Sequence, residues 1–152
     1  MIKKILSLVP HALAIFITFI FVDSLRYKFT NHEKTENIFG ILNDWAGSFG
    51  ASGLFSHSGV FSQYVIGSAE GVASLLLVLG ILPQFRKWQG VGALIACVVM
   101  TGALFFHLFT PLGTDPNNDG GGLFMVAVLV WLSSIVLVVL RRKELKSLIS
   151  RA

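Results

Sequence analysis

The sequence predicts an all-α membrane protein: a bundle of four transmembrane helices with an additional amphipathic helix in its first extracytoplasmic loop. Hydrophobic residues make up 54% of the 152 residues and charged residues only 13%, about half the roughly 25% that soluble domains carry. Four uninterrupted apolar runs are each long enough, at about 1.5 Å per residue, to cross a hydrocarbon core about 30 Å thick. We expect residues 1–152 to form a single membrane domain.

The distribution of cations along the chain predicts its orientation. The apolar runs place the spans at about residues 5–22, 63–82, 89–109 and 123–140. Nine of the twelve Lys and Arg residues lie before the first run, between the second and third, or after the fourth, up to Arg151. By the positive-inside rule both termini are cytoplasmic, and we expect a multi-pass protein of a bacterial inner (plasma) membrane. Lys3-Lys4 before an apolar run is also typical of a signal peptide, but the length of this run and the three later spans favour its retention.

The first connection, residues 23–62, is predicted to lie outside and to contain the additional helix at about 31–45. Thr30-Asn-His-Glu33 has the T-x-x-E pattern of a helix capping box. Apolar residues then follow at the spacing of one helix face: Ile38, Ile41, Leu42 and Trp45. Two placements are open, since such a helix lies either on the outer membrane surface or across the mouth of the bundle. Residues 47–62, rich in glycine, serine and phenylalanine, are expected to dip into the interface or to cover a pocket.

Several classes of function find no support in the residues. The net charge of +4 reflects the distribution of cations that sets the topology. The sequence has no basic patch interleaved with aromatic residues, so nothing in it indicates nucleic-acid binding. A single cysteine, Cys97, gives no C-x-x-C pair for disulfide exchange, and no cluster has zinc-ligand spacing, so we expect no metal. A bis-histidine haem needs two imidazoles at one depth. His11 and His107 lie near opposite ends of their spans and cannot form such a pair. His57 with His107 could do so only through the glycine-rich residues 47–62, so we do not expect a haem.

Glu70 is the one carboxylate within a predicted span. It lies seven residues, roughly 10 Å, inside the outer boundary of the second span. A carboxylate facing lipid there costs several kcal/mol, so we expect Glu70 to face the bundle interior. Gly67 and Gly71 flank it in a G-x-x-x-G pattern that allows a second helix to approach closely. Two roles are open: a structural acid that joins two helices, or a residue that handles protons or binds a ligand.

Other polar residues are predicted to reach the same outer third of the bundle, from the outer ends of the first, third and fourth spans. An acid, an imidazole and cations in an apolar setting are typical of a binding site. The ligand-binding or proton-handling candidates are therefore Glu70, His107, Lys28, Arg26 and Asp119. Each also has a plainer explanation: the cations suit snorkelling to the interface, the aspartate suits capping of the fourth span, and the histidine suits an interfacial hydrogen bond.

The order and spacing of several short stretches resemble the DoxX-like family of small four-helix integral membrane proteins. Over residues 25–128 these stretches are Tyr27-Lys-Phe-Thr30 with Ile38-Phe39, Glu70 ahead of LLLVLG, Met100-Thr-Gly-Ala103 with His107, Leu112-Gly113, and Asp119-Gly-Gly-Gly-Leu-Phe124. The resemblance implies the four-helix architecture and a single site containing Lys28, Glu70, His107 and Asp119. The family is named after a subunit of a thiosulfate:quinone oxidoreductase, and its members are often labelled oxidoreductases. This chain departs from the usual pattern in residues 47–62.

These observations together predict a quinone- or small-amphiphile-binding subunit of a membrane redox system, with a polar pocket in the outer half of the bundle. Glu70 would handle a proton, while His107 and Lys28 would hold a polar head group. The chain carries no cofactor motif of its own, so it would be at most an accessory subunit of a membrane oxidoreductase. Two other functions stay open: an assembly partner or chaperone for membrane proteins, and a small-solute transporter. We expect contacts with the lipid bilayer and with a membrane-protein partner or a second copy of the chain, and none with nucleic acid.

Overall fold

The computed structural model describes residues 2–150 and is helical, with no strand in that range. Arg151, one of the cations that predict the orientation, lies outside the described residues. The elements are α1 (Ile2–Phe29), α2 (Glu33–Gly47), α3 (Gln63–Leu79), the 3₁₀ turn η1 (Pro83–Phe85), α4 (Arg86–Phe109), α5 (Gly122–Leu140) and α6 (Arg142–Ile149). The predicted all-α class is therefore confirmed.

Three helical stretches are long and apolar enough to cross a membrane. They are Ser7–Phe29 in α1, Pro83–Phe109 in η1 and α4, and Gly122–Leu140 in α5. The fourth apolar helix, α3, has 17 residues, about 26 Å at 1.5 Å per residue, which is the lower limit for a span. These helices give the chain the features of a membrane protein.

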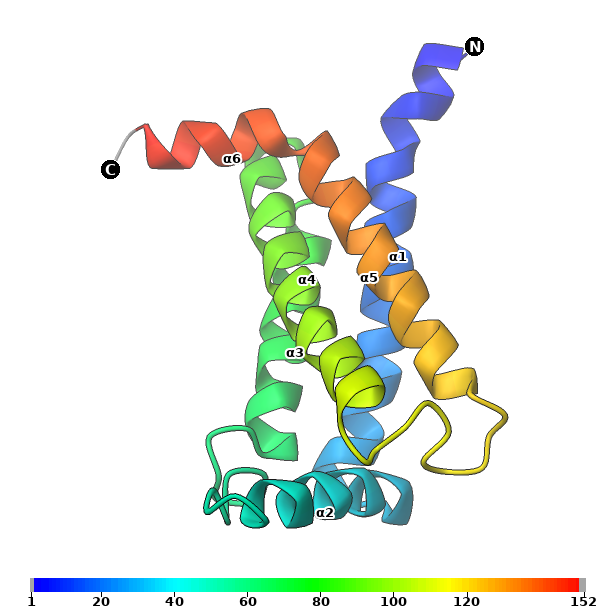
Figure 1. Cartoon of the computed structure of the whole chain (residues 1–152). Helices are drawn as coiled ribbons and strands as arrows, with labels where there is room; N and C mark the ends of the chain where they lie inside the picture. Colours follow the sequence, from blue (N-terminus) through cyan, green and yellow to red (C-terminus); the bar gives the residue numbers. More distant parts are fainter. Residues whose placement is uncertain (1, 151–152) are drawn as a thin grey trace.

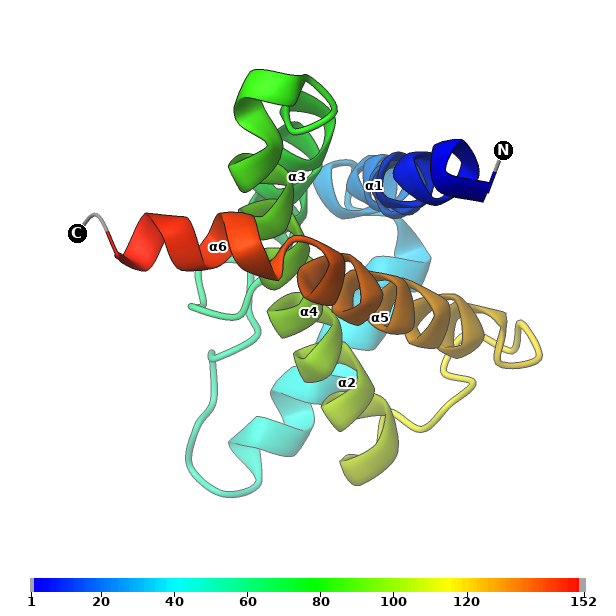
Figure 2. The same ribbon diagram turned by 90° about the horizontal axis from the view of Figure 1, so that it is seen from above.

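The four apolar helices run side by side, while α2 and α6 lie across opposite ends of the bundle (Figure 1). Among them, α3 packs against α1 and α4, and α5 packs against α4 and α1; Figure 2 shows the same helices from above. Both chain termini lie at the end that carries α6. We call this end the terminal end, and the end that carries α2 the loop end.

Small residues allow the bundle helices to approach closely. A Cβ on Gly92 of α4 would lie 2.8 Å from the Ala73 carbonyl oxygen of α3, so only glycine fits at this crossing. The buried apolar core consists of Ala14, Ile17, Phe21, Ala73, Leu77, Ala93, Ala96, Met100, Ala127, Val130 and Leu137. The outer faces keep large apolar side chains exposed, among them Phe19 and Val98. Apolar exposure on this scale is unusual for a soluble protein and suits a lipid environment.

The junction between α1 and α2 differs from the prediction. The first helix does not end near residue 22 but continues to Phe29, because its last two turns have a surface of α3 to pack on. The predicted capping box is also wrong. The Thr30 hydroxyl donates to the Arg26 carbonyl in the last turn of α1, and the N-cap of α2 is His32, whose Nδ1 accepts from the Lys34 N–H at 3.2 Å. Helix α2 consequently starts two residues later than expected, at Glu33.

Helix α2 packs over the loop end of the bundle, as Figure 1 shows. Its apolar face buries Leu42 and Ala46 in a second cluster with Phe55 and Leu112, onto which Phe106 of α4 packs. Of the two placements that the sequence leaves open, the packing shows contact with the end of the bundle. In residues 47–62, the ring of Phe55 is buried while Phe49 and Phe61 are exposed.

The terminal end contains a helix that the sequence analysis did not predict. Residues Arg142–Ile149 form α6, a stretch for which the sequence analysis noted only the cations after the fourth span. On the same side, α3 ends at Leu79 rather than near residue 82, and α4 begins at Arg86 rather than near residue 89. The turn between α3 and α4 brings Gly80 so close to Gln89 that a Cβ on the glycine would lie 2.2 Å from the Cβ of Gln89. Only glycine fits at this position.

Candidate functional site

Lys28 and Glu70 form a buried ion pair between α1 and α3. Lys28 Nζ lies 3.1 Å from Glu70 Oε1 and 3.0 Å from Oε2. The side chains are only 13% and 3% exposed. Both carboxylate oxygens are therefore engaged by one ammonium group, in a setting nearly free of solvent. The expectation that Glu70 faces the bundle interior agrees with this position.

The glycines around Glu70 make room for the lysine. A Cβ on Gly67 would lie 3.3 Å from Lys28 Cδ and 3.0 Å from the ring of Phe29. One turn later, Gly71 lies under Leu25, with a less crowded separation of 3.8 Å. The G-x-x-x-G pattern thus forms a shallow track on α3 along which the last two turns of α1 lie, as expected for small-residue helix contacts.

Two serines complete the surroundings of the ion pair. Lys28 Nζ also donates to the hydroxyl of Ser24, one turn earlier on α1. An ammonium group has three N–H donors, so Lys28 is fully satisfied by this hydroxyl and the two carboxylate oxygens. Ser74 donates to the Glu70 carbonyl oxygen at 2.8 Å and therefore does not contact the carboxylate.

A buried glutamine connects the ion pair to the loop end. Gln63 Nε2 donates to the Lys28 carbonyl oxygen at 2.8 Å and to Asn31 Oδ1 at 2.6 Å. Tyr64 donates its hydroxyl hydrogen to the same Asn31 oxygen. The Gln63 amide oxygen is buried and has no hydrogen-bond donor within the described part of the chain. Sequence reasoning missed this residue; its only signal was a polar side chain at the first position of an apolar run.

His107 lies apart from the ion pair. Its Nδ1 is 2.6 Å from the Gly113 carbonyl oxygen, and its ring packs edge-on against Phe124 at 5.6 Å between centroids. Helices α3 and α4 are antiparallel and meet where Gly92 faces Ala73. Counted from that crossing at 1.5 Å per residue, His107 lies roughly 18 Å farther toward the loop end than Glu70. The structure therefore does not bring the imidazole to the carboxylate.

Arg26 and Asp119 also have partners of their own. Arg26 pairs with Asp23 at 3.4 Å on the surface, where its side chain is 75% exposed. Asp119 accepts hydrogen bonds from the backbone N–H groups of Gly121, Gly122 and Leu123 at the start of α5. These bonds, with that of Leu123 contributing most, lower the pKa of Asp119. Of the five candidates, the structure joins only Lys28 and Glu70.

A second buried polar network lies at the terminal end. Arg141 Nε donates to Gln89 Oε1 at 2.7 Å, and Gln89 Nε2 lies 3.5 Å from the Leu77 carbonyl oxygen and 3.4 Å from His11 Nδ1. Arg141 and Gln89 are both buried, and Glu144 contacts Arg141 Nη1 at 3.4 Å. Sequence reasoning counted Arg141 only among the cations after the fourth span and did not predict this network.

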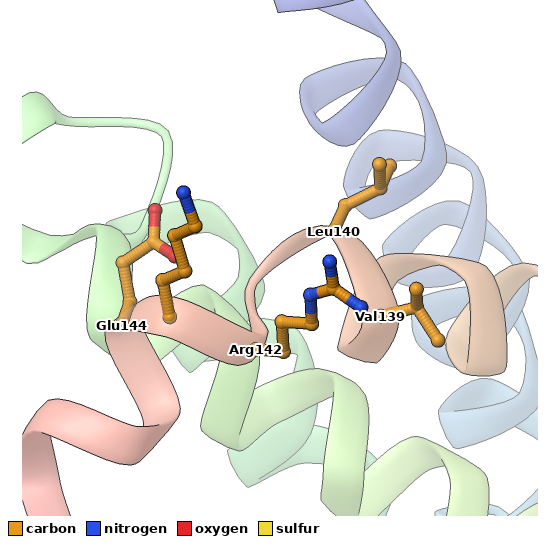
Figure 3. A pocket seen from close by; sticks show the side chains of 5 residues that line it. Val139, Leu140, Arg142 and Glu144 are labelled. Atoms are coloured by element: carbon orange, nitrogen blue, oxygen red, sulfur yellow. The ribbon is translucent and has the colours of Figure 1, made fainter.

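Two surface pockets lie elsewhere on the molecule. One is lined by Arg26, Tyr27, Thr30 and His32 at the α1–α2 junction. The other is lined by Val139, Leu140, Arg142, Lys143 and Glu144 at the terminal end (Figure 3). Neither has Glu70 or His107 in its wall. In the described part of the chain, no three or more His, Cys, Asp or Glu residues are grouped to hold a metal ion.

Comparison with protein-family models, curated proteins and solved structures finds no match to this chain. The function proposed below consequently depends on the geometry of the described residues and on the resemblance of the sequence.

Proposed function

We propose that the chain is a four-span inner-membrane protein of the DoxX-like kind, with α3 as its fourth span. Helix α3 lies beside three helices that are long enough to cross a membrane. Both chain termini lie at one end of the bundle, which is the arrangement that an even number of crossings produces. The cations near that end support a cytoplasmic location for both termini.

In this orientation, the Lys28–Glu70 pair is the polar centre of a site for a quinone or a similar small amphiphile in the outer half of the membrane. The observation that carries the proposal is a fully engaged ion pair, almost free of solvent, between two apolar helices. Desolvating both charges costs several kcal/mol per ion, and apolar residues of the same size would join the helices at least as well. A chemical role explains the pair better than helix association alone.

The groups around the pair suit a quinone head group. Lys28 Nζ would exchange its hydrogen bond to Ser24 for one to a quinone carbonyl oxygen, and Glu70 would exchange a proton with the corresponding hydroxyl of the quinol. The unpaired amide oxygen of Gln63, two turns nearer the loop end on α3, would add an acceptor for the other hydroxyl of the quinol. Reduction of a quinone takes up two electrons and two protons. The electrons would come from a separate redox protein, so this chain would supply binding and proton transfer only.

The packing gives less support to an assembly partner that uses its small-residue faces. Gly67 and Gly71 are covered by Phe29, Lys28 and Leu25 of the same chain. This G-x-x-x-G track is therefore not free to hold a helix of another protein, and the redox-associated function remains our proposal.

The test is binding of ubiquinone and menaquinone analogues to the purified full chain in lipid nanodiscs, followed by photo-crosslinking and calorimetry. We expect Glu70→Gln and Lys28→Met to weaken binding at least tenfold. His107→Gln, which alters a polar residue away from the pair, serves as the matched control and should bind as the unaltered chain does. If neither quinone binds, or if Glu70→Gln binds as well as the unaltered chain, the proposal is wrong.

A further inference from the structure

The surface of the terminal end is strongly cationic. Exposed or half-buried cations come from the start of α4 and from α6: Arg86, Lys87, Arg142, Lys143 and Lys146. Glu144 is the only acid in residues 1–12, 80–91 and 138–150. Its carboxylate already contacts the Arg141 guanidinium at 3.4 Å. The positive charge of this surface is therefore not cancelled within the chain.

Helix α6 is fixed across the end of the bundle by two contacts. Arg141, at its N-cap, is buried and bonded to Gln89 of α4. One turn later, Leu145 lies so close to Gly90 of α4 that a Cβ on the glycine would be 2.8 Å from Leu145 Cγ. The helix consequently lies crosswise to the bundle (Figure 1), in the plane that a membrane surface would occupy. An amphipathic basic helix in this position is typical of an interfacial helix.

The pocket in Figure 3 joins this cationic surface to the apolar side of α5. Val139 and Leu140 form its apolar part, and Arg142, Lys143 and Glu144 form its charged part. The apolar part continues along an exposed face of α5 that includes Leu132 and Val136. An occupant would thus meet guanidinium and ammonium groups at the membrane surface and an aliphatic helix face directly below them.

We propose that this pocket binds an anionic phospholipid. The phosphate would lie between Arg142 and Lys143, and an acyl chain would follow the exposed face of α5 past Val139. Phosphate groups are bound well by Arg and Lys side chains, with bidentate geometry available to the guanidinium. The apolar continuation distinguishes a lipid from free phosphate, and the excess of cations favours an anionic over a zwitterionic head group. The proposal is independent of any ligand at the Lys28–Glu70 pair.

The test compares lipid retention by the full chain in nanodiscs of phosphatidylcholine with and without phosphatidylglycerol, measured by native mass spectrometry and by lipid-dependent thermal stability. The pocket variant Arg142→Gln/Lys143→Gln removes two cations from exposed positions. Each cation near an anionic membrane surface adds to the binding free energy. Losing both cations should therefore weaken phosphatidylglycerol binding on the order of thirtyfold. The control variant Arg26→Gln/Lys34→Gln removes the same charge at the loop end and should bind as the unaltered chain does.

Two further measurements define the chemistry. Arg142→Lys/Lys143→Arg keeps both charges and should retain most of the binding. Inorganic phosphate should displace no more lipid than sodium chloride of equal ionic strength, because it lacks the acyl chain. Equal retention by the pocket variant, an equal loss in the control variant, equal binding of phosphatidylcholine, or displacement by phosphate would each overturn the proposal.

Discussion

At the loop end the buried cation Lys28 faces a buried carboxylate, whereas at the terminal end the buried cation Arg141 donates from Nε to the neutral amide of Gln89 and contacts the partly exposed carboxylate of Glu144, at 3.4 Å. The first arrangement involves side chains of two helices, α1 and α3. The second connects more of the bundle, since Gln89 of α4 also contacts His11 of α1 and the Leu77 carbonyl oxygen of α3. The loop-end group is therefore a charge pair between two helices, and the terminal-end group is a hydrogen-bond network that connects three helices with Arg141.

The difference indicates which group is available for chemistry. The guanidinium of Arg141 has only hydrogen-bond donors and keeps its proton, although burial lowers its pKa. The carboxylate of Glu70, by contrast, changes between acceptor and donor when it takes up a proton. We therefore expect the terminal-end network to contribute mainly to stability, and the loop-end pair to contribute to both stability and function.

The largest effect should come from separating the loop-end pair. Glu70→Leu leaves the ammonium of Lys28 buried without a counter-charge and should lower the free energy of unfolding by about 3–5 kcal/mol. The double variant Lys28→Met/Glu70→Leu removes both charges and should recover most of that loss. Reversible unfolding in mild detergent measures the free energies of the unaltered chain, of Glu70→Leu, of Lys28→Met and of the double variant. A double variant that is as unstable as the sum of both single variants would show that the side chains do not act as a pair.

The terminal-end network should respond more weakly. Gln89→Leu removes the hydrogen-bond acceptor of a buried guanidinium, and a hydrogen bond to a charged group is worth about 1.5–3 kcal/mol. Gln89→Glu keeps an oxygen acceptor for Arg141 Nε and adds a counter-charge, so its loss should be smaller. The same unfolding measurement compares them. Equal losses in both variants would indicate that Gln89 matters through its packing and not through Arg141.

Alanine substitutions at two glycines, one near each end of the bundle, test how tightly the ends are packed. A Cβ on Gly80 would meet backbone and Cβ atoms of Gln89 at 2.2–2.6 Å, whereas a Cβ on Gly67 would meet only side-chain atoms of Phe29 and Lys28 at 3.0 Å or more. We expect Gly80→Ala to cost about 1–3 kcal/mol. Gly67→Ala should cost less than about 1 kcal/mol, because flexible neighbours can move and alanine favours the helix. Thermal unfolding of both variants checks the order; a larger loss for Gly67→Ala would contradict it.

The smallest effect concerns the exposed carboxylate of Asp119 at the start of α5. Its pKa is lower in the folded chain than in the unfolded chain, because backbone N–H groups, that of Leu123 first, bond to the ionised form. The contribution of ionised Asp119 to the free energy of unfolding is therefore complete above the unfolded pKa near 4. It disappears as the pH falls through the lower, folded pKa. Unfolding followed between pH 5 and pH 2 should show a weaker acid dependence in Asp119→Asn. An unchanged acid dependence would mean that other carboxylates account for it.

Sequence reasoning located the apolar helices and the isolated acid because both depend on local composition. It misplaced the end of α1 because hydropathy marks where apolar residues stop, while a helix continues as long as it has a partner to pack on. Lys28 was predicted as a loop residue for this reason, although Ser24 and Lys28 lie one turn apart on the same helix. Gln63, Gln89 and Arg141 were missed because a single polar residue at the edge of an apolar run gives no indication of its partner.

The helical class, the apolar helices and the inward position of Glu70 follow from the amino-acid sequence, because the cost of exposing a charge or a peptide group to lipid leaves few alternatives. That Glu70 meets Lys28 and not His107 follows from the packing of the bundle, since it depends on how far antiparallel helices slide along one another. The contacts that fix this register, at Gly67 and Gly92, are close approaches between residues distant in the chain. A short-range pattern marks where such approaches can occur and does not specify which residues they bring together.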